Sequence, residues 1–186
     1  MITCAIKKNT MFVEISYGIN EGIIMKVDTG SPVSLLSKFH ITQIFGYPQF
    51  VVNKVISEDS SKYSKVYFNT YNNKGVVSCI PCRMSNVNIG GETVGEFNFY
   101  LNLSNDEDIT PLLGMDFLNR CNGNLIGEKY LTLYLTSSPV NVIIPECVMQ
   151  INEIRFKEEL EHESNNVRSN IVRDKLFLDT SLPEII

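Results

Sequence analysis

The sequence predicts a mainly β protein, built as a barrel or a sandwich, and its N-terminal third supplies the main observations. Three short segments suited to strands follow one another: 2–6, 11–17 and the apolar run that ends at Asp28. Turn residues separate them, at 7–10 and at 18–22. Short strands at this spacing are typical of all-β barrels and sandwiches. The 186 residues suit one such domain with room for an appended segment.

The middle of the chain continues the strand pattern with one interruption. Residues 34–45 lose the alternation of a strand and are expected to form a short helix. Residues 57–62 are polar, which predicts a solvated loop. The other expected elements are strand fragments at 50–52 and 55–56, strands at 65–71 and 76–80, a hairpin at 87–101 with Phe97, Phe99 and Leu101 facing inward, a short helix at 117–121, and a last hairpin formed by 125–126 and 131–135.

The character of the sequence changes near residue 145. Residues 151–168 are charged and carry apolar side chains at roughly helical spacing, which predicts a helix. The last residues, 175–186, are apolar again and could be a partner-binding arm, a dimer strap or a segment that lies in a cleft. We therefore expect a domain at 1–144 and a C-terminal extension at 145–186.

An acid at the end of a buried strand marks the main candidate site. Asp28 follows the apolar run from Ile23, and burial of a carboxylate is costly unless it is hydrogen-bonded or shares a proton. Thr29, the Gly30 amide and Ser31 are the nearby donors. Gly30 is expected to turn the backbone with positive φ and to leave space above the carboxylate. The sequence Asp-Thr-Gly-Ser resembles the active-site loop of aspartic proteases.

A second stretch strengthens this resemblance. Leu112-Leu113-Gly114-Met115-Asp116 is similar to the apolar-apolar-Gly-x-Asp/Asn segment that closes the retropepsin-like fold. The resemblance covers roughly 1–136. It implies a closed β-barrel with a flap hairpin and one short helix, in which the Leu113–Gly114 segment passes behind the catalytic loop. Asp116 is then expected to support that loop rather than to react.

The hairpin between these two motifs resembles the flap that covers a bound substrate. Asn72, Asn73 and Gly75 give a strong turn signal between two expected strands. By resemblance, the flap tip and its substrate contacts are expected at Tyr71, Asn72, Asn73, Lys74 and Gly75.

The chemistry of aspartic proteases implies two copies of this chain. It requires two carboxylates about a hydrogen bond apart that share one proton and hold a water. The chain has one Asp-Thr-Gly sequence. The most similar other stretch, Asp179-Thr180-Ser181, lacks the glycine and is not followed by an expected strand. We therefore expect a twofold homodimer with both Asp28 residues at the axis. The expected activity is an aspartic endopeptidase acting on polypeptides, with no cofactor and no metal.

The resemblance also assigns roles within the loop. Thr29 is expected to take part in hydrogen bonds that interlock the paired loops, and Gly30 to offer its amide to the carboxylates. Ser31 is expected to donate to Asp28, which would lower the pKa of that carboxyl. Ser31→Ala is then expected to raise the acid limb of the pH–rate profile.

Two other classes remain open from the sequence. One is a catalytically silent module that keeps the retropepsin-like fold for dimerisation or peptide binding. The other rests on Cys79-Ile80-Pro81-Cys82, which matches the spacing of redox and zinc motifs. This pair follows an expected strand and has no second ligand pair, so buried structural cysteines are the preferred interpretation.

Composition limits the classes of binding partner and the cellular compartment that we expect. The formal net charge is -5, so the chain lacks the excess of positive charge typical of nucleic-acid-binding proteins, and nucleic-acid binding is not expected. No apolar run is long enough for a membrane span, and Met1 to Lys8 shows no signal-peptide core. Five scattered cysteines argue against a disulfide framework and favour a reducing compartment. We expect a cytoplasmic protein.

Overall fold

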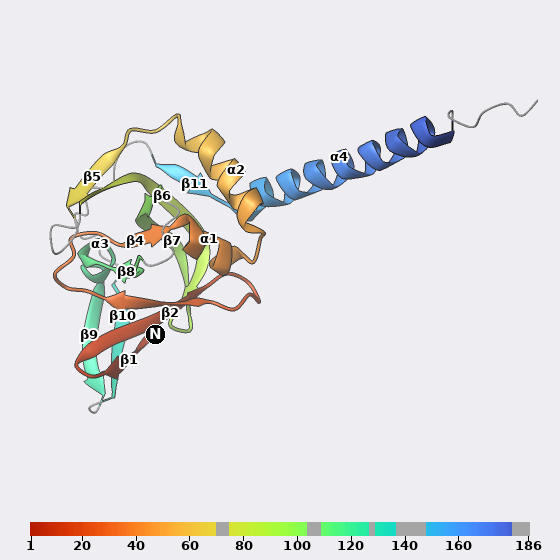
Figure 1. Ribbon diagram of the computed structural model, residues 1–186. Coiled ribbons are helices and arrows are strands. Elements are labelled where there is room, and N and C mark those ends of the chain that lie inside the picture. Colours follow the sequence, from red (N-terminus) through yellow and green to blue (C-terminus); the bar gives the residue numbers. More distant parts are fainter. Residues whose placement is uncertain (70–74, 104–108, 127–128, 137–147, 180–186) are drawn as a thin grey trace, which may run out of the picture. The chain divides into compact units, whose positions relative to one another are not determined.

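A computed structural model describes residues 1–69, 75–103, 109–126, 129–136 and 148–179 of the chain (Figure 1). The chain divides into two units, Met1–Asn152 and Glu153–Ile186. The first unit holds all the strands among the described residues, and the second is a long helix.

Six strands of the first unit close into a barrel, which confirms the mainly β expectation. Each strand pairs with the next, and the last returns to the first. In barrel order the strands are β2 (Thr10–Ser16), β3 (Ile23–Val27), β8 (Leu112–Leu113), β4 (Leu35–Ser37), β7 (Glu92–Asn102) and β6 (Val76–Ile89). The β3–β8 and β4–β7 pairs are parallel, and the other four are antiparallel.

The remaining strands extend the barrel sheet. β1 (Ile2–Lys7) pairs with β2 and with β10 (Tyr130–Leu135), and β10 pairs with β9 (Cys121–Ile126). β5 (Val66–Asn69) pairs with β6. β11 (Met149–Ile151) also pairs with β6, in parallel, although these residues were expected in the C-terminal extension. The first unit therefore continues beyond residue 144.

Three aromatic side chains pack together in the core of the first unit. Phe97 and Phe99 stack with centroids 5.6 Å apart, and Phe117 meets Phe97 edge to face at 5.7 Å. These three residues and Leu101 are at most 2% exposed, so the predicted inward alternation along β7 is confirmed. Burial of each large apolar side chain stabilises the fold by about 1.5–3 kcal/mol.

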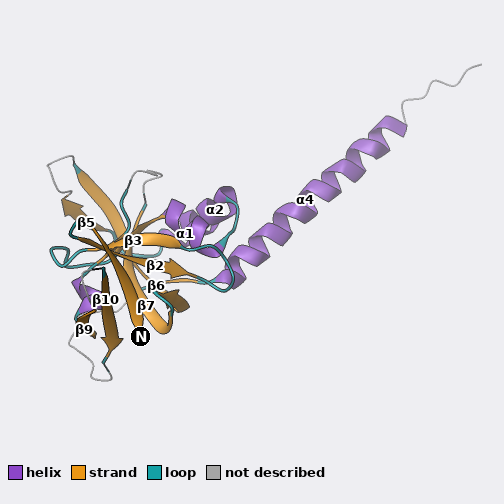
Figure 2. Cartoon of the chain, turned by 90° about the horizontal axis from the view of Figure 1, so that it is seen from below, coloured by secondary structure: helices purple, strands orange, loops and turns teal. Residues whose placement is uncertain are grey.

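Two helices of the first unit differ from the elements that the sequence predicts. The strand fragments expected at 50–52 and 55–56 are wrong, because Gln49–Ser60 forms helix α2. Of the loop expected at 57–62, only residues 61–62 lie outside this helix. Its buried residues Val51, Val52, Val55 and Ile56 recur at the spacing of one helix face, so packing overrides their β-branched propensity. Helix α1 (Lys38–Phe45) is shorter at its start than predicted, because Leu35–Ser37 forms β4. The two helices lie side by side in Figure 1 and Figure 2.

The short helix after the second motif also differs from its predicted bounds. Helix α3 spans Met115–Leu118, whereas 117–121 was expected, and Cys121 begins β9. The first unit thus has three helices among its described residues rather than the one that the family resemblance implied. The predicted last hairpin is confirmed as β9 and β10, paired in antiparallel register.

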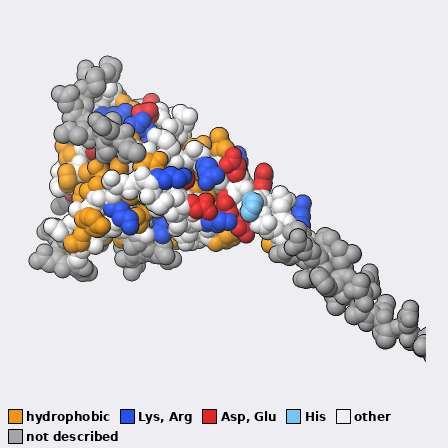
Figure 3. Space-filling model, turned by 90° about the horizontal axis from the view of Figure 1, so that it is seen from above, with side chains coloured by type: hydrophobic (Ala, Val, Ile, Leu, Met, Phe, Trp, Pro, Cys, Tyr) orange, Lys and Arg blue, Asp and Glu red, His pale blue; other side chains and the backbone are white. Residues whose placement is uncertain are grey.

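The described part of the second unit is helix α4 (Glu153–Asp179). The helix expected at 151–168 is confirmed from residue 153 onward and continues beyond 168, whereas Ile151 belongs to β11. Ion pairs one turn apart support its first turns: Lys157 Nζ lies 3.0 Å from Glu153 Oε1. None of the described helices is both long enough and apolar enough to pass through a membrane. On the face of the molecule drawn in Figure 3, acidic and basic side chains are mixed.

Candidate active site

The backbone of Asp28 is fixed by the second motif. β3 ends at Val27, which is 5% exposed, and Asp28 is the next residue. β8 runs parallel to β3, with Leu113 in register with Val27. The amide of Asp28 donates to the carbonyl oxygen of Leu113 at 3.0 Å. The predicted passage of the Leu113–Gly114 segment beside the acid loop is therefore present in the structure.

The carboxylate of Asp28 has two local donors. The Gly30 amide donates to Oδ1 at 3.0 Å, and Lys26 Nζ lies 3.1 Å from Oδ2. The Asp28 side chain remains 28% exposed. Thr29 and Gly30 are exposed beside it. The site thus presents an accessible carboxylate whose two oxygens are each oriented by a donor.

The donors and the partial burial of Asp28 act on its pKa in opposite directions. The hydrogen bond from the Lys26 ammonium lowers the pKa of Asp28 most, and partial burial opposes it. The Gly30 amide, the charge of Lys26 and the Ser31 amide add further lowering. The net pKa lies below the ordinary value of 3.8, so the carboxyl of the single chain is ionised at neutral pH.

Gly30 is suited to the loop because it lacks a side chain, not because it adopts an unusual backbone angle. The expected positive φ is wrong, because Gly30 is not among the residues of this chain with positive φ. A Cβ at this position would lie 3.2 Å from Asp28 Oδ1, closer than an ordinary contact. The absence of a side chain therefore lets the Gly30 amide approach the carboxylate.

The hydroxyl of Ser31 does not serve Asp28 as expected. It donates instead to the carbonyl oxygen of Val33 at 2.7 Å. The amide of Ser31 donates to the backbone carbonyl of Asp28 at 3.1 Å, which closes the turn. The contribution of Ser31 to the low pKa of Asp28 comes from this amide, and the side chain supports the loop.

A buried network joins the acid loop to the second motif. Asp116 accepts from the Ser34 amide at 2.8 Å and from the Ser34 hydroxyl at 2.6 Å. The Ser34 hydroxyl in turn accepts from the Gly114 amide at 3.0 Å. Asp116 also accepts from the Phe117 amide at 2.8 Å. Ser34 is fully buried, and these contacts tie together segments that are 80 or more residues apart.

Sequence reasoning missed Ser34. Its place in the loop, after Val33 and before two leucines, resembles that of any small polar residue entering a strand. Its partners, Gly114 and Asp116, are distant in the chain, so no local pattern shows the network. An excess of hydroxyl residues between Asp28 and Ser37 is the one signal that could have suggested it.

Backbone contacts bring the two motifs into close approach. The amides of Met115 and Asp116 donate to the carbonyl oxygens of Ser31 and Pro32, at 2.9 and 3.2 Å. A Cβ at Gly114 would overlap the carbonyl carbon and oxygen of Val33. Glycine is therefore required at 114 for the loop and α3 to meet.

Asp116 has the environment of a structural acid. Burial raises the pKa of its carboxyl above the ordinary value of 3.8, and the hydrogen bonds from Ser34 and Phe117 oppose that effect. Its oxygens are occupied by loop and helix donors. This geometry agrees with the supporting position expected for Asp116.

The hairpin that was expected to form the flap is described only in part. β5 and β6 pair in antiparallel register, from Val66 with Cys79 to Asn69 with Val76. Gly75 directly precedes β6 and has a φ of 126°, which suits a turn. The other expected tip residues, Tyr71, Asn72, Asn73 and Lys74, lie outside the described residues.

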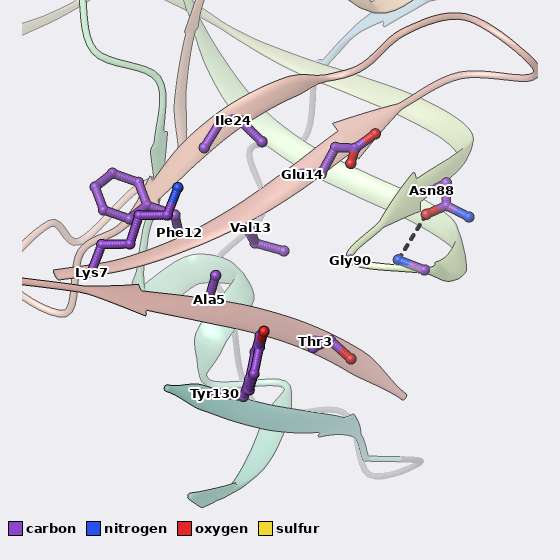
Figure 4. A pocket seen from close by; sticks show the side chains of 11 residues that line it. Thr3, Ala5, Lys7, Phe12, Val13, Glu14, Ile24, Asn88, Gly90 and Tyr130 are labelled. Atoms are coloured by element: carbon purple, nitrogen blue, oxygen red, sulfur yellow. Dashed lines mark hydrogen bonds between the residues drawn. The ribbon is translucent and has the colours of Figure 1, made fainter. Parts of the chain in front are cut away.

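One hollow of the described surface is lined by residues outside the Asp28 loop. Its volume is about 600 Å³, and β1, β2, β10 and the β6–β7 turn contribute its lining. Figure 4 shows Phe12, Ile24 and Tyr130 around it, with Gly90 at one end. Asp28, Thr29 and Gly30 do not line it.

The cysteine pair on β6 is buried. Cys79 and Cys82 are fully buried and pair across the sheet with Asn102 and Phe99. Burial raises the pKa of the Cys79 thiol to about 12 and raises that of Cys82 as well. Both thiols are therefore protonated at neutral pH, which disfavours redox chemistry at this motif.

The barrel topology and the two motifs together characterise the fold. A closed barrel carries Asp-Thr-Gly after β3, β8 runs parallel to that strand, and α3 follows Gly114. This arrangement agrees with the one that the resemblance to the retropepsin-like fold implied.

Comparisons with known proteins give matches among solved structures. A retropepsin-like aspartic protease from Rickettsia conorii is 26% identical over 71% of this chain and 88% of that chain, with a TM-score of 0.45. EIAV protease in complex with the inhibitor HBY-793 is 18% identical over 61% and 86% of the two chains, with a TM-score of 0.34. No protein-family model and no curated relative matches the chain.

Proposed function

We propose that this protein is an aspartic endopeptidase in which two chains each contribute Asp28 to one site. The observation that carries this proposal is the state of Asp28, an accessible carboxylate oriented by the Gly30 amide and fixed in place by β8. One carboxylate of the pair would act as general base on a water, and its protonated partner would polarise the scissile carbonyl.

The position of Asp116 supports a two-chain site. Asp116 is the acid that the second motif brings to the loop, but both of its oxygens accept hydrogen bonds from Ser34 or Phe117. These bonds hold Asp116 within the fold, so we do not assign it as the partner that shares a proton with Asp28. A second copy of the chain supplies the missing carboxylate in a twofold arrangement.

The other loop residues have supporting roles in this proposal. Thr29, exposed at the loop, would bond to its counterpart in the second chain. Leu113, Gly114, Ser31 and Asp116 hold the loop in shape. An extended polypeptide substrate would lie across the Asp28 pair, bound largely through its backbone.

The cytoplasm is the proposed compartment. The four described cysteines, Cys4, Cys79, Cys82 and Cys121, are all free thiols. Free thiols persist in a reducing environment.

Cleavage of a mixed peptide library by the wild type and by Asp28→Asn tests the proposal. The assay covers about pH 4 to about pH 7, and the mass of the active species is recorded. Asp59→Asn is the matched control, because it makes the same change at an acid whose ion-pair partner is the surface residue Lys62. We expect cleavage by a dimer of the wild type and of the control, and none by Asp28→Asn. A dimer without Asp28-dependent cleavage would contradict the protease and favour a silent binding module.

A further inference from the structure

Lys26 shares the accessible face of β3 with the candidate catalytic acid. Side chains alternate along a strand, and Met25 and Val27 point into the barrel, at 0% and 5% exposed. Ile24, Lys26 and Asp28 therefore point outward together. Lys26 Nζ lies 3.1 Å from Asp28 Oδ2, and the Lys26 side chain is 40% exposed.

Among the described residues, Lys26 is the cation that shifts the pKa of Asp28. Across the sheet, Lys26 faces Phe12 on β2 and Leu112 on β8, which are both uncharged. The titratable groups on the elements packed against β3 and its loop are Glu14 on β2, Lys38 and His40 on α1, and Asp116 on α3. None of these four contributes to the shifted pKa of Asp28, whereas Lys26 contributes both a hydrogen bond and a charge.

We propose that Lys26 is a positioning residue of the site: its ammonium holds one oxygen of Asp28 and sets the pH range in which the Asp28 pair works, moving that range toward acid. This inference rests on the proposed protease function. Lys26 is well placed for the role because its ammonium bonds to Oδ2, while the Gly30 amide bonds to Oδ1.

The charge of Lys26 would affect how a pair of Asp28 carboxylates shares one proton. Two carboxylates at hydrogen-bond distance repel each other when both are ionised, which raises one of their apparent pKa values. In a twofold dimer each Asp28 brings its own Lys26, so two cations oppose that repulsion. Both steps of the titration then occur at lower pH, and the form with a single proton is populated in a more acidic range.

The pH–rate profile separates this role from a merely structural one. We would choose one peptide that the wild type cleaves. For this peptide, kcat/KM would be measured against pH with the wild type, Lys26→Met and Lys26→Arg. Loss of the charge is expected to move both limbs to higher pH, so that Lys26→Met is slower than the wild type at acid pH and faster near neutral pH. Lys26→Arg should retain the wild-type limbs. A profile that Lys26→Met lowers equally at every pH would contradict the proposal.

Lys62→Met is the matched control for the loss of a lysine from an ion pair. Lys62 pairs with Asp59 at 2.9 Å on the surface, and its side chain is 68% exposed. Its pH profile should coincide with that of the wild type. A shift equal to that of Lys26→Met would show a general charge effect and would contradict the specific role of Lys26.

A titration that needs no activity tests Lys26 independently. The carboxyl carbon of Asp28, assigned by its disappearance from the NMR spectrum of Asp28→Asn, would be followed against pH in the wild type and in Lys26→Met. The apparent pKa of Asp28 should be higher in Lys26→Met. An unchanged pKa would overturn the inference even in an active protease, whereas a raised pKa in a protein that cleaves nothing would uphold Lys26 and reject the protease.

Discussion

The two acids of the site, Asp28 and Asp116, lie on neighbouring segments but in opposite environments. Asp28 takes its side-chain donors from residues within two positions in the chain and remains partly exposed. Asp116 takes donors from Ser34, 82 residues away, inside the fold. The pKa of Asp28 is lowered, first by the hydrogen bond from Lys26, and that of Asp116 is raised, first by burial.

The contrast fits the two proposed roles, in which Asp28 reacts and Asp116 holds the loop. A carboxylate that is to bind a water must keep an accessible face, so its loop cannot be stabilised by burying the acid itself. The fold places the buried acid on α3 instead, where it receives the amide and the hydroxyl of the loop residue Ser34. Hydrogen bonds to a charged group contribute about 1.5–3 kcal/mol each, so this network is a substantial part of what holds the loop.

Gly114→Ala should break the contact between the two segments and have the largest effect on stability. The new Cβ would overlap the Val33 carbonyl, and overpacking of a rigid site costs about 1–3 kcal/mol or more. Urea denaturation measures the change in the free energy of unfolding. Gly95→Ala is the matched control, because a Cβ there meets open space and the change should stay within about 1 kcal/mol. Equal stability of the two variants would contradict the close approach at Gly114.

Ser34→Ala should weaken the same contact without a clash. It leaves the Gly114 amide without its acceptor and removes one donor from Asp116, which should cost about 1–3 kcal/mol. Ser61→Ala is the control, since the hydroxyl of Ser61 bonds to Glu58 on the surface and its loss should cost no more than about 0.5 kcal/mol. Matching denaturation midpoints for the two variants would show that the buried network contributes little.

The two acids should give pH dependences of opposite sign. In the fold Asp116 binds its proton more tightly than in the unfolded chain, so its contribution to stability falls as the pH rises from about the ordinary value of 3.8 through its raised pKa. Asp28 binds its proton less tightly, so its contribution is present above 3.8 and is lost as the pH falls through its lowered pKa.

Urea midpoints of the wild type, Asp116→Asn and Asp28→Asn, measured at several pH values, test these signs. The wild-type advantage over Asp116→Asn should shrink as the pH rises, and the advantage over Asp28→Asn should grow. Two differences with the same slope would mean that the environments of the acids are not opposed.

Ser31→Ala should have the smallest effect. The hydroxyl bonds to Val33, so its loss should cost about 1 kcal/mol and leave the acid limb of the pH–rate profile in place. This outcome is the opposite of the one expected from the sequence. A raised acid limb in Ser31→Ala would show that the hydroxyl reaches Asp28 after all.

The sequence predicted what local patterns encode. The strands around Asp28, the inward alternation of Phe97 and Phe99, and the pairing of β9 with β10 all follow from periodicity and turn residues. The two motifs were visible because each places distinctive residues within a few positions. Their joint meaning came from family resemblance rather than from spacing alone.

The failures of prediction involve contacts between distant segments. Helix α2 was assigned as strands because valine and isoleucine favour strands, whereas their buried face is set by packing. The Ser34–Asp116 network and the pairing of β11 with β6 join residues far apart in the chain. The direction of the Ser31 hydroxyl depends on which acceptor the folded loop brings nearer, Val33 or Asp28.

The most direct test of the central claim is activity in mixed dimers of the wild type and Asp28→Asn. The two chains would be refolded together at a constant amount of wild type and a rising share of the variant. If each site needs Asp28 from both chains, activity per wild-type chain should fall in proportion, to about half at equal amounts, because random pairing places half of the wild-type chains with the variant. Activity per wild-type chain that stays constant would contradict a site shared between two copies of Asp28.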